Sequence, residues 1–364
     1  MSGHFDSTLR LIDANLDRLS EGLRVLEDVA RFILQDTPIT DQLRDMRHRL
    51  STAQPHLSEK LLAARDAGED IGREAKGVEE TKENIVDVIA SNAKRGQESL
   101  RVLEEFAKLS SSPAYLNESS LQEARFTLYD IEKKLTLKLA REDKKNRITG
   151  VYVILDTETL GERNEIEVAQ EVIKGGASII QLRDKHKDKE SLATLIHELK
   201  QICNESGVLF LLNDYVDMAL ATDVDGVHLG PNDFPIPLAR RILPLNKLIG
   251  RSVRSVEQAR QAEEEGADYL GVGSMYASPT RPDAEIIGPK KLRQIKATSD
   301  LPVVGIGGIN ESNADHVIDA GADSIAVIDA VLHADDIFKT SRQLSAKFEG
   351  KNPIGVSRTS EEEK

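Results

Sequence analysis

The sequence predicts a (β/α)8 barrel preceded by an all-α helical bundle. In the second part of the chain, eight short apolar runs alternate with helical segments over about 200 residues, the pattern of a barrel of parallel strands. The first part has few glycines and no clear strand, and one of its helical segments occurs twice. We therefore expect an all-α domain over residues 1–145, a barrel over 146–349 and a polar tail over 350–364.

Composition narrows the class of protein. No run of about 18 apolar residues occurs, so no membrane span is expected. The charged N-terminal segment lacks the apolar stretch of a secretory signal. The single cysteine, Cys203, excludes an internal disulfide and fits a reducing cytoplasm. A net charge of −14 and the absence of tryptophan argue against nucleic-acid binding. We expect a cytoplasmic protein that acts on small molecules, and the sequence leaves a homo-oligomer open.

The bundle prediction rests on an internal repeat. Residues 12–31 and 89–108 are identical at ten of twenty positions, at an offset of 77. A second helical segment follows each copy, at 43–50 and 121–128, so we expect two related helical hairpins packed as a bundle. Apolar or small residues recur with the spacing of one buried helical face, at positions 12, 16, 19, 23, 26 and 30 and again at 89, 93, 96, 100, 103 and 107.

Five polar residues are also identical between the copies, and two interpretations of them stay open. Arg18, Glu21 and Arg24 point away from the apolar face, so packing does not require their identity. They are either a ladder of surface ion pairs, each worth a few tenths of a kcal/mol, or part of an anion- and metal-handling site shared by two pseudo-symmetric halves. The candidate residues are Asn15, Arg18, Glu21, Arg24 and Glu27, with Asn92, Arg95, Glu98, Arg101 and Glu104 in the second copy.

The barrel prediction rests on eight strand candidates. A charged segment at 141–147 bridges the bundle and the barrel, and the tail from Gly350 to Lys364 has little to bury and is expected to be disordered. The strand candidates are residues 151–156, 178–182, 208–212, 226–229, 247–250, 268–273, 302–307 and 324–328.

Two aspartates stand at neighbouring strand ends, where a barrel carries its active site. Asn213 and Asp214 follow the third apolar run at once, and Asp233 lies just past the fourth. Two carboxylates with an amide between them suit Mg²⁺, which keeps waters and binds substrate phosphates with its other positions. The alternative is that both aspartates are helix N-caps, a common role for Asp after a strand.

Other strand ends carry groups that suit anions. Gln181, Arg183 and Lys185 alternate after the second strand, so an extended backbone would place them on one side, where Arg and Lys suit a phosphate or pyrophosphate. Ser252 stands at the end of the fifth strand, and a loop rich in Gly, Ser and Thr follows the sixth and ends in Arg281. The ends of the seventh and eighth strands are the usual phosphate cup of this fold. We expect two anionic groups, one with a metal and one without.

Residues 150–330 closely resemble thiamine-phosphate synthase. The ordered motifs QLRDK, LND, DGVHLGPND, IGRS, ADYLGVGSMYASPT, PVVGIGGI and GADSIAVI carry this resemblance across nearly the whole barrel. It implies Mg²⁺-assisted condensation of 4-amino-5-hydroxymethyl-2-methylpyrimidine pyrophosphate with 4-methyl-5-(2-phosphoethyl)thiazole, or its carboxylated form, to thiamine phosphate and pyrophosphate. The competing family of this fold is the thiazole tautomerase, which does no metal-assisted pyrophosphate chemistry.

The resemblance also implies site residues. The family usually has Thr at Ser278, Lys at Arg281 and a small residue such as Ser at Asp329, where a carboxylate should repel a phosphate unless it faces away or caps the helix. The metal would be held by Asp214 and Asp233, the pyrimidine pyrophosphate by Gln181, Arg183, Lys185, Asn213, Ser252 and Arg281, and the thiazole phosphate by Ser278, Thr280, Gly308, Ile328 and Asp329.

The first part of the chain, about residues 5–140, resembles a helical domain fused before this synthase in some bacteria, with the signature ANLDRxxEGLRVLED. That family is associated with phosphorylation of hydroxymethylpyrimidine phosphate to the pyrophosphate, the substrate of the barrel. ATP is a candidate donor, and the spacing assigns no kinase residues. The alternative is a non-catalytic bundle for dimerisation or scaffolding.

Overall fold

A computed structural model of the chain describes residues 2–51, 55–64, 81–109 and 116–350. The predicted disorder of the tail therefore lies, apart from Gly350, outside the described residues. The chain forms two compact units, Met1–Ala140 and Arg141–Lys364. None of the helices in the described ranges has the length and hydropathy to cross a membrane.

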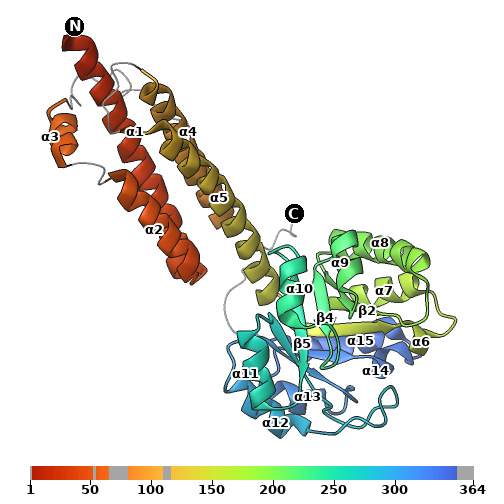
Figure 1. The fold of residues 1–364 in the computed structure, drawn as a ribbon. Helices are drawn as coiled ribbons and strands as arrows, with labels where there is room; N and C mark the ends of the chain where they lie inside the picture. The colour runs from red at the N-terminus through yellow and green to blue at the C-terminus, as the bar shows by residue number, and fades with distance from the viewer. Residues whose placement is uncertain (1, 52–54, 65–80, 110–115, 351–364) are drawn as a thin grey trace, which may run out of the picture. The chain divides into compact units, whose positions relative to one another are not determined.

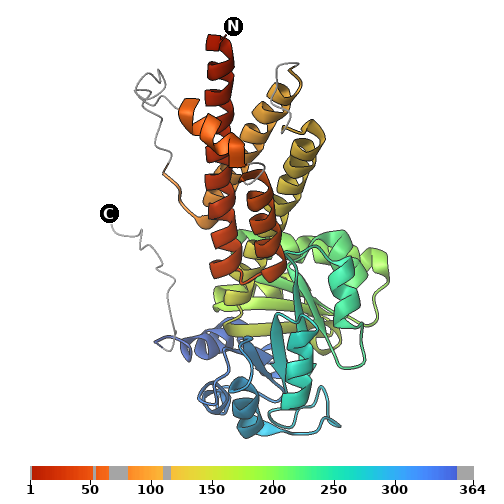
Figure 2. The same cartoon turned by 60° about the vertical axis from the view of Figure 1, so that its left-hand side comes forward.

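The first unit is the predicted helical bundle. Helices α1 and α4 contain the two copies of the repeat and lie side by side (Figures 1 and 2). Ten of the twelve predicted core positions are buried, and Leu16 and Ala107 are partly buried against the same core. The helices are α1 (Ser2–Asp28), a π-helical turn (Val29–Ile33), α2 (Thr37–Ser51), α3 (Pro55–Ala64), α4 (Ile85–Ala107) and α5 (Glu118–Asn146).

The close approach of α1 and α4 depends on a glycine. A Cβ atom on Gly22 would lie 2.9 Å from the backbone oxygen of Asn92, so a larger residue would force the helices apart. Helix α3 was not expected from the sequence, and the predicted second helix of each hairpin is present as α2 and α5. The charged segment 141–147 is helical through Asn146, as the last turns of α5.

The second unit is a closed barrel of eight parallel strands in sequential order, in which β1 pairs with both β2 and β8. All eight predicted strands are confirmed. Three end later than predicted, so that Arg183, Asn213 and Ser252 lie on their strands and not after them. The strands are β1 (Gly150–Asp156), β2 (Ala177–Arg183), β3 (Leu209–Asn213), β4 (Gly226–Leu229), β5 (Leu248–Val253), β6 (Tyr269–Val272), β7 (Val303–Ile306) and β8 (Ser324–Val327).

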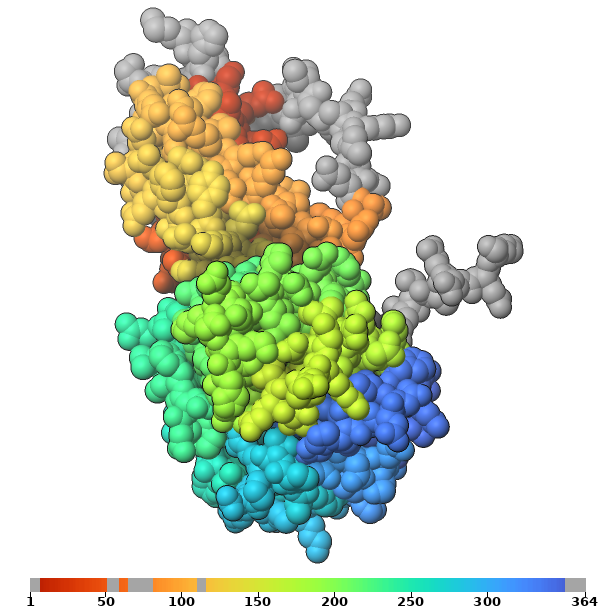
Figure 3. Space-filling view, turned by 90° about the vertical axis from the view of Figure 1, so that its right-hand side faces the viewer, coloured from red at the N-terminus to blue at the C-terminus, as the bar shows by residue number. Residues whose placement is uncertain are grey.

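Helices cover the outer face of the strands (Figure 1). Closure brings the two ends of this unit together: α15 packs against α7, and Figure 3 shows the blue surface of the last helices directly against the yellow-green surface of the first. The helices are α6 (Thr157–Leu160), α7 (Glu165–Lys174), α8 (Lys189–Glu205), α9 (Val216–Thr222), α10 (Ile236–Ile242), α11 (Val256–Glu264), α12 (Gly288–Lys296), α13 (Ala314–Ile318), α14 (Asp329–Leu332) and α15 (Ile337–Ala346).

Three aspartates stabilise the amino-terminal end of the barrel by one repeated device. Asp225, Asp268 and Asp323 precede β4, β6 and β8, and each accepts a hydrogen bond from the first or second backbone N–H of the strand before it. Each carboxylate also pairs with a cation, which compensates its charge. This end of the barrel is therefore cross-linked strand to strand by neutralised carboxylates.

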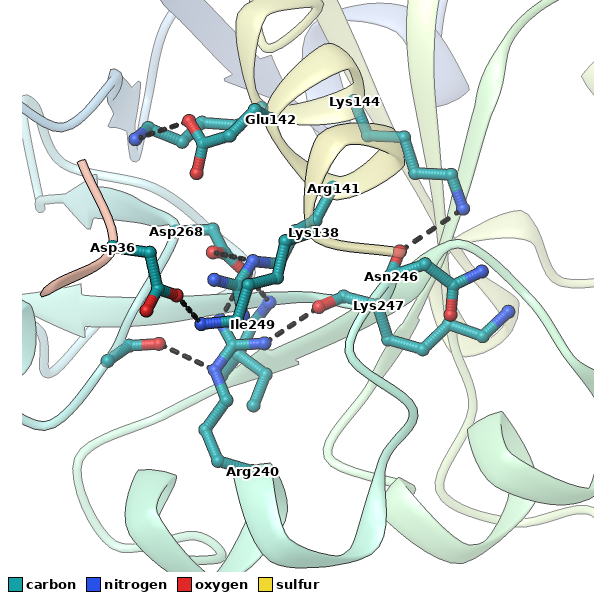
Figure 4. A network of polar contacts seen from close by, with 12 residues as sticks. Asp36, Lys138, Arg141, Glu142, Lys144, Arg240, Asn246, Lys247, Ile249 and Asp268 are labelled. Atoms are coloured by element: carbon teal, nitrogen blue, oxygen red, sulfur yellow. Dashed lines mark hydrogen bonds and ion pairs between the residues drawn. The ribbon is translucent and has the colours of Figure 1, made fainter. Parts of the chain in front are cut away.

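Asp268 is the most enclosed of the three, with 4% of its surface exposed. It accepts from the N–H of Ile249 at 2.7 Å and pairs with Arg240, while Arg141 of α5 lies 3.5 Å away (Figure 4). Arg240 also donates to two backbone carbonyls at 2.7 Å, so its guanidinium is held on several sides.

We predict that Asp268→Asn lowers the free energy of unfolding of the barrel by about 3–5 kcal/mol, because it leaves the buried Arg240 without its counter-charge. Chemical denaturation, with amide exchange at Ile249 as the local measurement, tests this. The matched control is Asp217→Asn, which breaks an exposed pair with Lys189 and should cost about 1 kcal/mol or less. Equal effects of the two substitutions would contradict the prediction.

Candidate active site

A cavity of about 430 Å³ opens among the carboxyl ends of the strands. It brings together twelve of the thirteen barrel residues selected from the sequence; Lys185 is exposed and does not line it. His228, Arg254, Gln258 and Asn310 also line the cavity, and the sequence analysis did not select them. The selected residues that line it are Gln181, Arg183, Asn213, Asp214, Asp233, Ser252, Ser278, Thr280, Arg281, Gly308, Ile328 and Asp329.

Asp214 and Asp233 form a carboxyl pair on one side of the cavity. Burial, and then the hydrogen-bonding and negative charge of Asp233, raise the pKa of Asp214 to about 7, although Lys185 and Arg183 act in the opposite direction. Two carboxyls this close favour a shared proton or a bound cation. They match the one or two carboxylates by which Mg²⁺ is usually held. No cluster of three or more His, Cys, Asp or Glu side chains suited to a metal occurs in the described ranges.

Neither aspartate caps a helix. Other residues occupy the N-cap positions of α9 and α10, and neither of those caps uses a side chain. Asp214 has a φ of 65°, and its Oδ2 accepts from the Asn213 amide at 2.6 Å. Asp233 Oδ2 accepts from the N–H of Gly230 at 2.8 Å. The helix-cap interpretation is therefore wrong, and the metal interpretation stays a prediction.

β2 directs its polar side chains as the alternation predicted, but only two of the three reach the cavity. Gln181 is buried inside the barrel, and Arg183 lies at the rim, where it forms an ion pair with Asp156 at the end of β1. Lys185 projects into solvent. Arg183 is thus held by its own aspartate, whereas the side chain of Lys185 is exposed and does not line the cavity.

His228 is a cavity residue that the sequence analysis missed. It is 8% exposed on β4, and its Nε2 lies 2.9 Å from Ser252 Oγ. Burial, and then the positive charges of Arg251 and Arg281, lower the pKa of His228 to about 4, so the ring is neutral at pH 7. The alternation of side chains along β4 could have identified it, because His228 pairs with Asn213 in the register of β3 and β4 and so faces the same side.

The other side of the cavity is built by the loop after β6 and by the start of α14. Asp329 accepts from the hydroxyls of Ser278 at 3.1 Å and Thr280 at 2.6 Å. The carboxylate therefore neither faces away from the loop nor caps the helix, whose N-cap is Ile328. It occupies the two hydroxyls that were expected to bind a phosphate.

The end of β7 approaches this loop through two glycines with positive φ, Gly307 and Gly308. A Cβ on Gly308 would lie 2.3 Å from the backbone oxygen of Ala277, so any side chain there would push the loop away. The glycines thereby fix the width of the cavity on this side.

The ten residues selected in the bundle separate into two kinds. Arg18, Glu21 and Arg24 are exposed, as are their counterparts, while the Asn and Glu positions of both copies are buried. Glu27 and Glu104 are each 2% exposed.

The two buried glutamates join the helices of their own hairpins. Glu27 accepts from Arg44 at 3.2 Å and from Arg47 at 2.9 Å, both on α2. Glu104 accepts from Arg125 of α5 at 2.6 Å. Hydrogen bonds from these arginines lower the pKa of both carboxyls although burial alone would raise it. The identity of Glu27 and Glu104 thus has a structural cause. Arg24 and Arg101 take part in it, because each also pairs with the buried glutamate of its own copy.

The chain is similar to known proteins over both units. Residues 151–331 match the family described as thiamine monophosphate synthase, and residues 10–134 match the ThiD2 family. The thiamine-phosphate synthase of Thermosynechococcus vestitus is 36% identical over 345 residues, which cover 94% of this chain and 96% of that protein. The enzyme of the same name from Synechocystis is 33% identical over 346 residues, 94% of this chain and 97% of its own length.

One solved structure supports the barrel assignment. The thiamine phosphate pyrophosphorylase from Pyrococcus furiosus is 43% identical, with a TM-score of 0.53, and the match covers 57% of this chain and 98% of that chain.

Proposed function

This chain belongs to the thiamine-phosphate synthase family, and from that premise we propose how its residues carry out the reaction. The enzyme is a transferase of thiamine biosynthesis. The bond between the pyrimidine methylene carbon and pyrophosphate breaks with its electron pair on the pyrophosphate, and the thiazole nitrogen forms the new carbon–nitrogen bond. The observation that carries our assignment of roles is that one cavity holds a carboxyl pair on one side and a hydroxyl-rich loop on the other.

The carboxyl pair is the proposed metal site. Asp214 and Asp233 would hold Mg²⁺, and Asn213 positions Asp214 by its 2.6 Å hydrogen bond. Bound there, the ion supplies charge neutralisation for the departing pyrophosphate. Arg183 and Arg281 add cationic hydrogen-bond donors to the same charge as it develops.

The remaining lining residues hold the two rings in register, which is the main task when bond breaking precedes bond making. We assign Gln181, Asn213 and Ser252 to the pyrimidine, with Lys185 reaching the pyrophosphate from solvent. Ser278, Thr280, Gly308, Ile328 and Asp329 would surround the thiazole phosphate.

The metal assignment predicts that Asp214→Asn and Asp233→Asn each lower synthase turnover on the order of a hundredfold or more, because charge stabilisation is lost while the side-chain shape is kept. Thiamine phosphate formation by the full chain at limiting Mg²⁺ is the measurement, and added Mg²⁺ should recover part of the loss. Asp335→Asn, an exposed position outside the cavity, is the charge-matched control. Near-normal turnover in both site variants would reject the metal site.

Asp329 generates a prediction specific to this chain. Its carboxylate repels a phosphate and occupies both loop hydroxyls, so Asp329→Ser should lower the KM for the thiazole phosphate about fivefold to tenfold. Steady-state kinetics with the pyrimidine substrate saturating tests this, with Asp335→Ser as the control for net charge. A raised KM would show instead that Asp329 organises the loop for binding.

For the bundle we propose a kinase role that supplies the barrel with its substrate. A phosphoryl group would pass from ATP to the pyrimidine monophosphate, giving the pyrophosphate and ADP. The support is the match to the ThiD2 family together with the exposed Arg, Glu and Arg positions that both copies share. Arg24 and Arg101 among them also pair with the buried glutamates of their own copies.

Arg24 and Arg101 are the positions at which this role is tested. Their side chains are 51% and 55% exposed and pair with glutamates and aspartates on their own helices. The double substitution to Ala should reduce ADP formation at least about tenfold while unfolding changes by about 1 kcal/mol or less.

The control is Lys94→Ala, which removes an exposed cation from α4 at a position that differs between the copies. The metal-site variants of the barrel should keep full ADP formation, which separates the two activities in one chain. A full-length enzyme that makes thiamine phosphate but forms no ADP from the pyrimidine monophosphate would favour the scaffold interpretation.

A further inference from the structure

A continuous network of hydrogen bonds crosses the barrel interior; five of its seven side chains line the cavity. It links Ser252 to Asp214 through five intervening side chains from strands β4, β6, β1, β2 and β3. The successive distances are 2.9 Å from Ser252 to His228, 3.0 Å to Tyr269, 3.1 Å to Tyr152, 2.6 Å to Gln181, 2.9 Å to Asn213 and 2.6 Å to Asp214. The two tyrosines are 0–1% exposed and do not line the cavity.

The donor and acceptor atoms of these side chains give the hydrogen bonds of the network one direction. Asn213 donates from its Nδ2 to Oδ2 of Asp214 and accepts at its Oδ1 from Nε2 of Gln181. Gln181 must then donate its NH₂ group to Asn213, which leaves its oxygen to accept the Tyr152 hydroxyl proton.

The donor and acceptor roles of Gln181 determine where the remaining protons lie. Tyr152 has no second proton, so Tyr269 donates to it. Tyr269 can then only accept from His228, which places the imidazole proton on Nδ1. Nε2 is left as an acceptor for the hydroxyl proton of Ser252. Burial raises the pKa of both tyrosines and lowers that of His228, so each group keeps the protonation that this order requires.

Two inward-facing glycines make room for the rings of this chain. A Cβ on Gly250 would lie 2.1 Å from Cζ of Tyr269, and a Cβ on Gly271 would lie 2.8 Å from Cε1 of His228. Both are strand-interior positions where a side chain would otherwise fill the barrel. Gly250 is the register partner of both His228 and Tyr269, and Gly271 is the register partner of Ser252, so the rings occupy space that these glycines leave empty.

We propose that Tyr152 and Tyr269 are positioning residues of the synthase, which hold His228 as the Nδ1–H tautomer and so present the lone pairs of Ser252 Oγ to the cavity. Ser252 is thereby an acceptor for a substrate N–H group, and the aminopyrimidine is the substrate that carries such donors. Neither tyrosine touches the substrate. The identity of the substrate in this inference rests on the proposed function. The tautomer of His228 does not depend on the proposed function.

The alternative is that the chain only satisfies the buried hydroxyls of two tyrosines. Both interpretations predict that removing a hydroxyl lowers stability. Only ours predicts a change in the tautomer of His228 and in the kinetics of one substrate.

The first test is ¹⁵N NMR of the histidine side chains in the full-length protein at neutral pH, with the His228 signals assigned by their absence in His228→Gln. We expect protonated Nδ1 and unprotonated Nε2 in the wild type. In Tyr269→Phe the acceptor at Nδ1 is gone, and in Tyr152→Phe the Tyr269 proton turns to His228, so both variants should shift the proton to Nε2. A wild-type imidazole protonated at Nε2 would overturn the proposal even if neither variant folds.

The second test is steady-state kinetics of the same proteins. Tyr269→Phe should lower kcat/KM for the pyrimidine pyrophosphate about tenfold or more, while the KM of the thiazole phosphate changes less than about twofold. Ser324→Ala is the matched control, because it removes another fully buried hydroxyl of the barrel. The Ser324 hydroxyl donates to the backbone oxygen of Gly150 and is not part of the hydrogen-bond network. If Tyr269→Phe behaves like Ser324→Ala in both tests, the tyrosines are structural and the proposal is wrong. A wild-type enzyme without synthase activity would reject the proposed function. The NMR measurement would still show which ring nitrogen of His228 carries the proton, and so test the direction of the hydrogen bonds.

Discussion

The hydrogen bonds between β1 and β8 close the sheet, and the site exists only because of that closure. Parallel strands in sequential order bring eight carboxyl ends to one rim, so residues as distant as Gln181 and Asp329 line one cavity. Closure also leaves no sheet edge, so the backbone of every strand is paired on both sides. The barrel can therefore place charged groups at its two ends without losing its ladder of backbone hydrogen bonds.

The two ends of the barrel use carboxylates in opposite ways. At the amino-terminal end, Asp225, Asp268 and Asp323 each meet a backbone N–H and a cation, so their charge is compensated within the protein. At the other end, Asp214 has Asp233 as its neighbour, and the pKa of Asp214 rises to about 7. A compensated carboxylate stabilises the fold, whereas the two carboxyls of this pair lie side by side and favour a shared proton or a bound cation. This difference in charge compensation marks the carboxyl ends of the strands as the candidate site.

The strands, the bundle core and most of the cavity were predictable because they follow local rules. Strand-end residues face one rim in any parallel barrel, so Asp214 or Arg183 could be selected by position alone. Asp329 could not be interpreted in the same way, because its role depends on hydroxyls 49 and 51 residues away. The exclusion of Asp214 as a helix cap depended on the start of α9 and on the positive φ of Asp214, which no spacing encodes. Glu27 and Glu104 lay at the edge of the apolar face, and only the second helix of each hairpin shows that they are ion-paired.

The tyrosines of the barrel interior were missed for a different physical reason. An inward Tyr on an apolar strand has the same pattern as a core residue, and its hydroxyl partner lies on another strand. A polar chain through a core costs stability unless every member is satisfied, and an apolar core of equal volume would be at least as stable. Here every member is satisfied, two glycines give up volume to admit the rings, and the two ends of the chain reach the cavity at Asp214 and Ser252. A core arranged for stability alone does not require both ends of its polar chain to emerge in the same cavity.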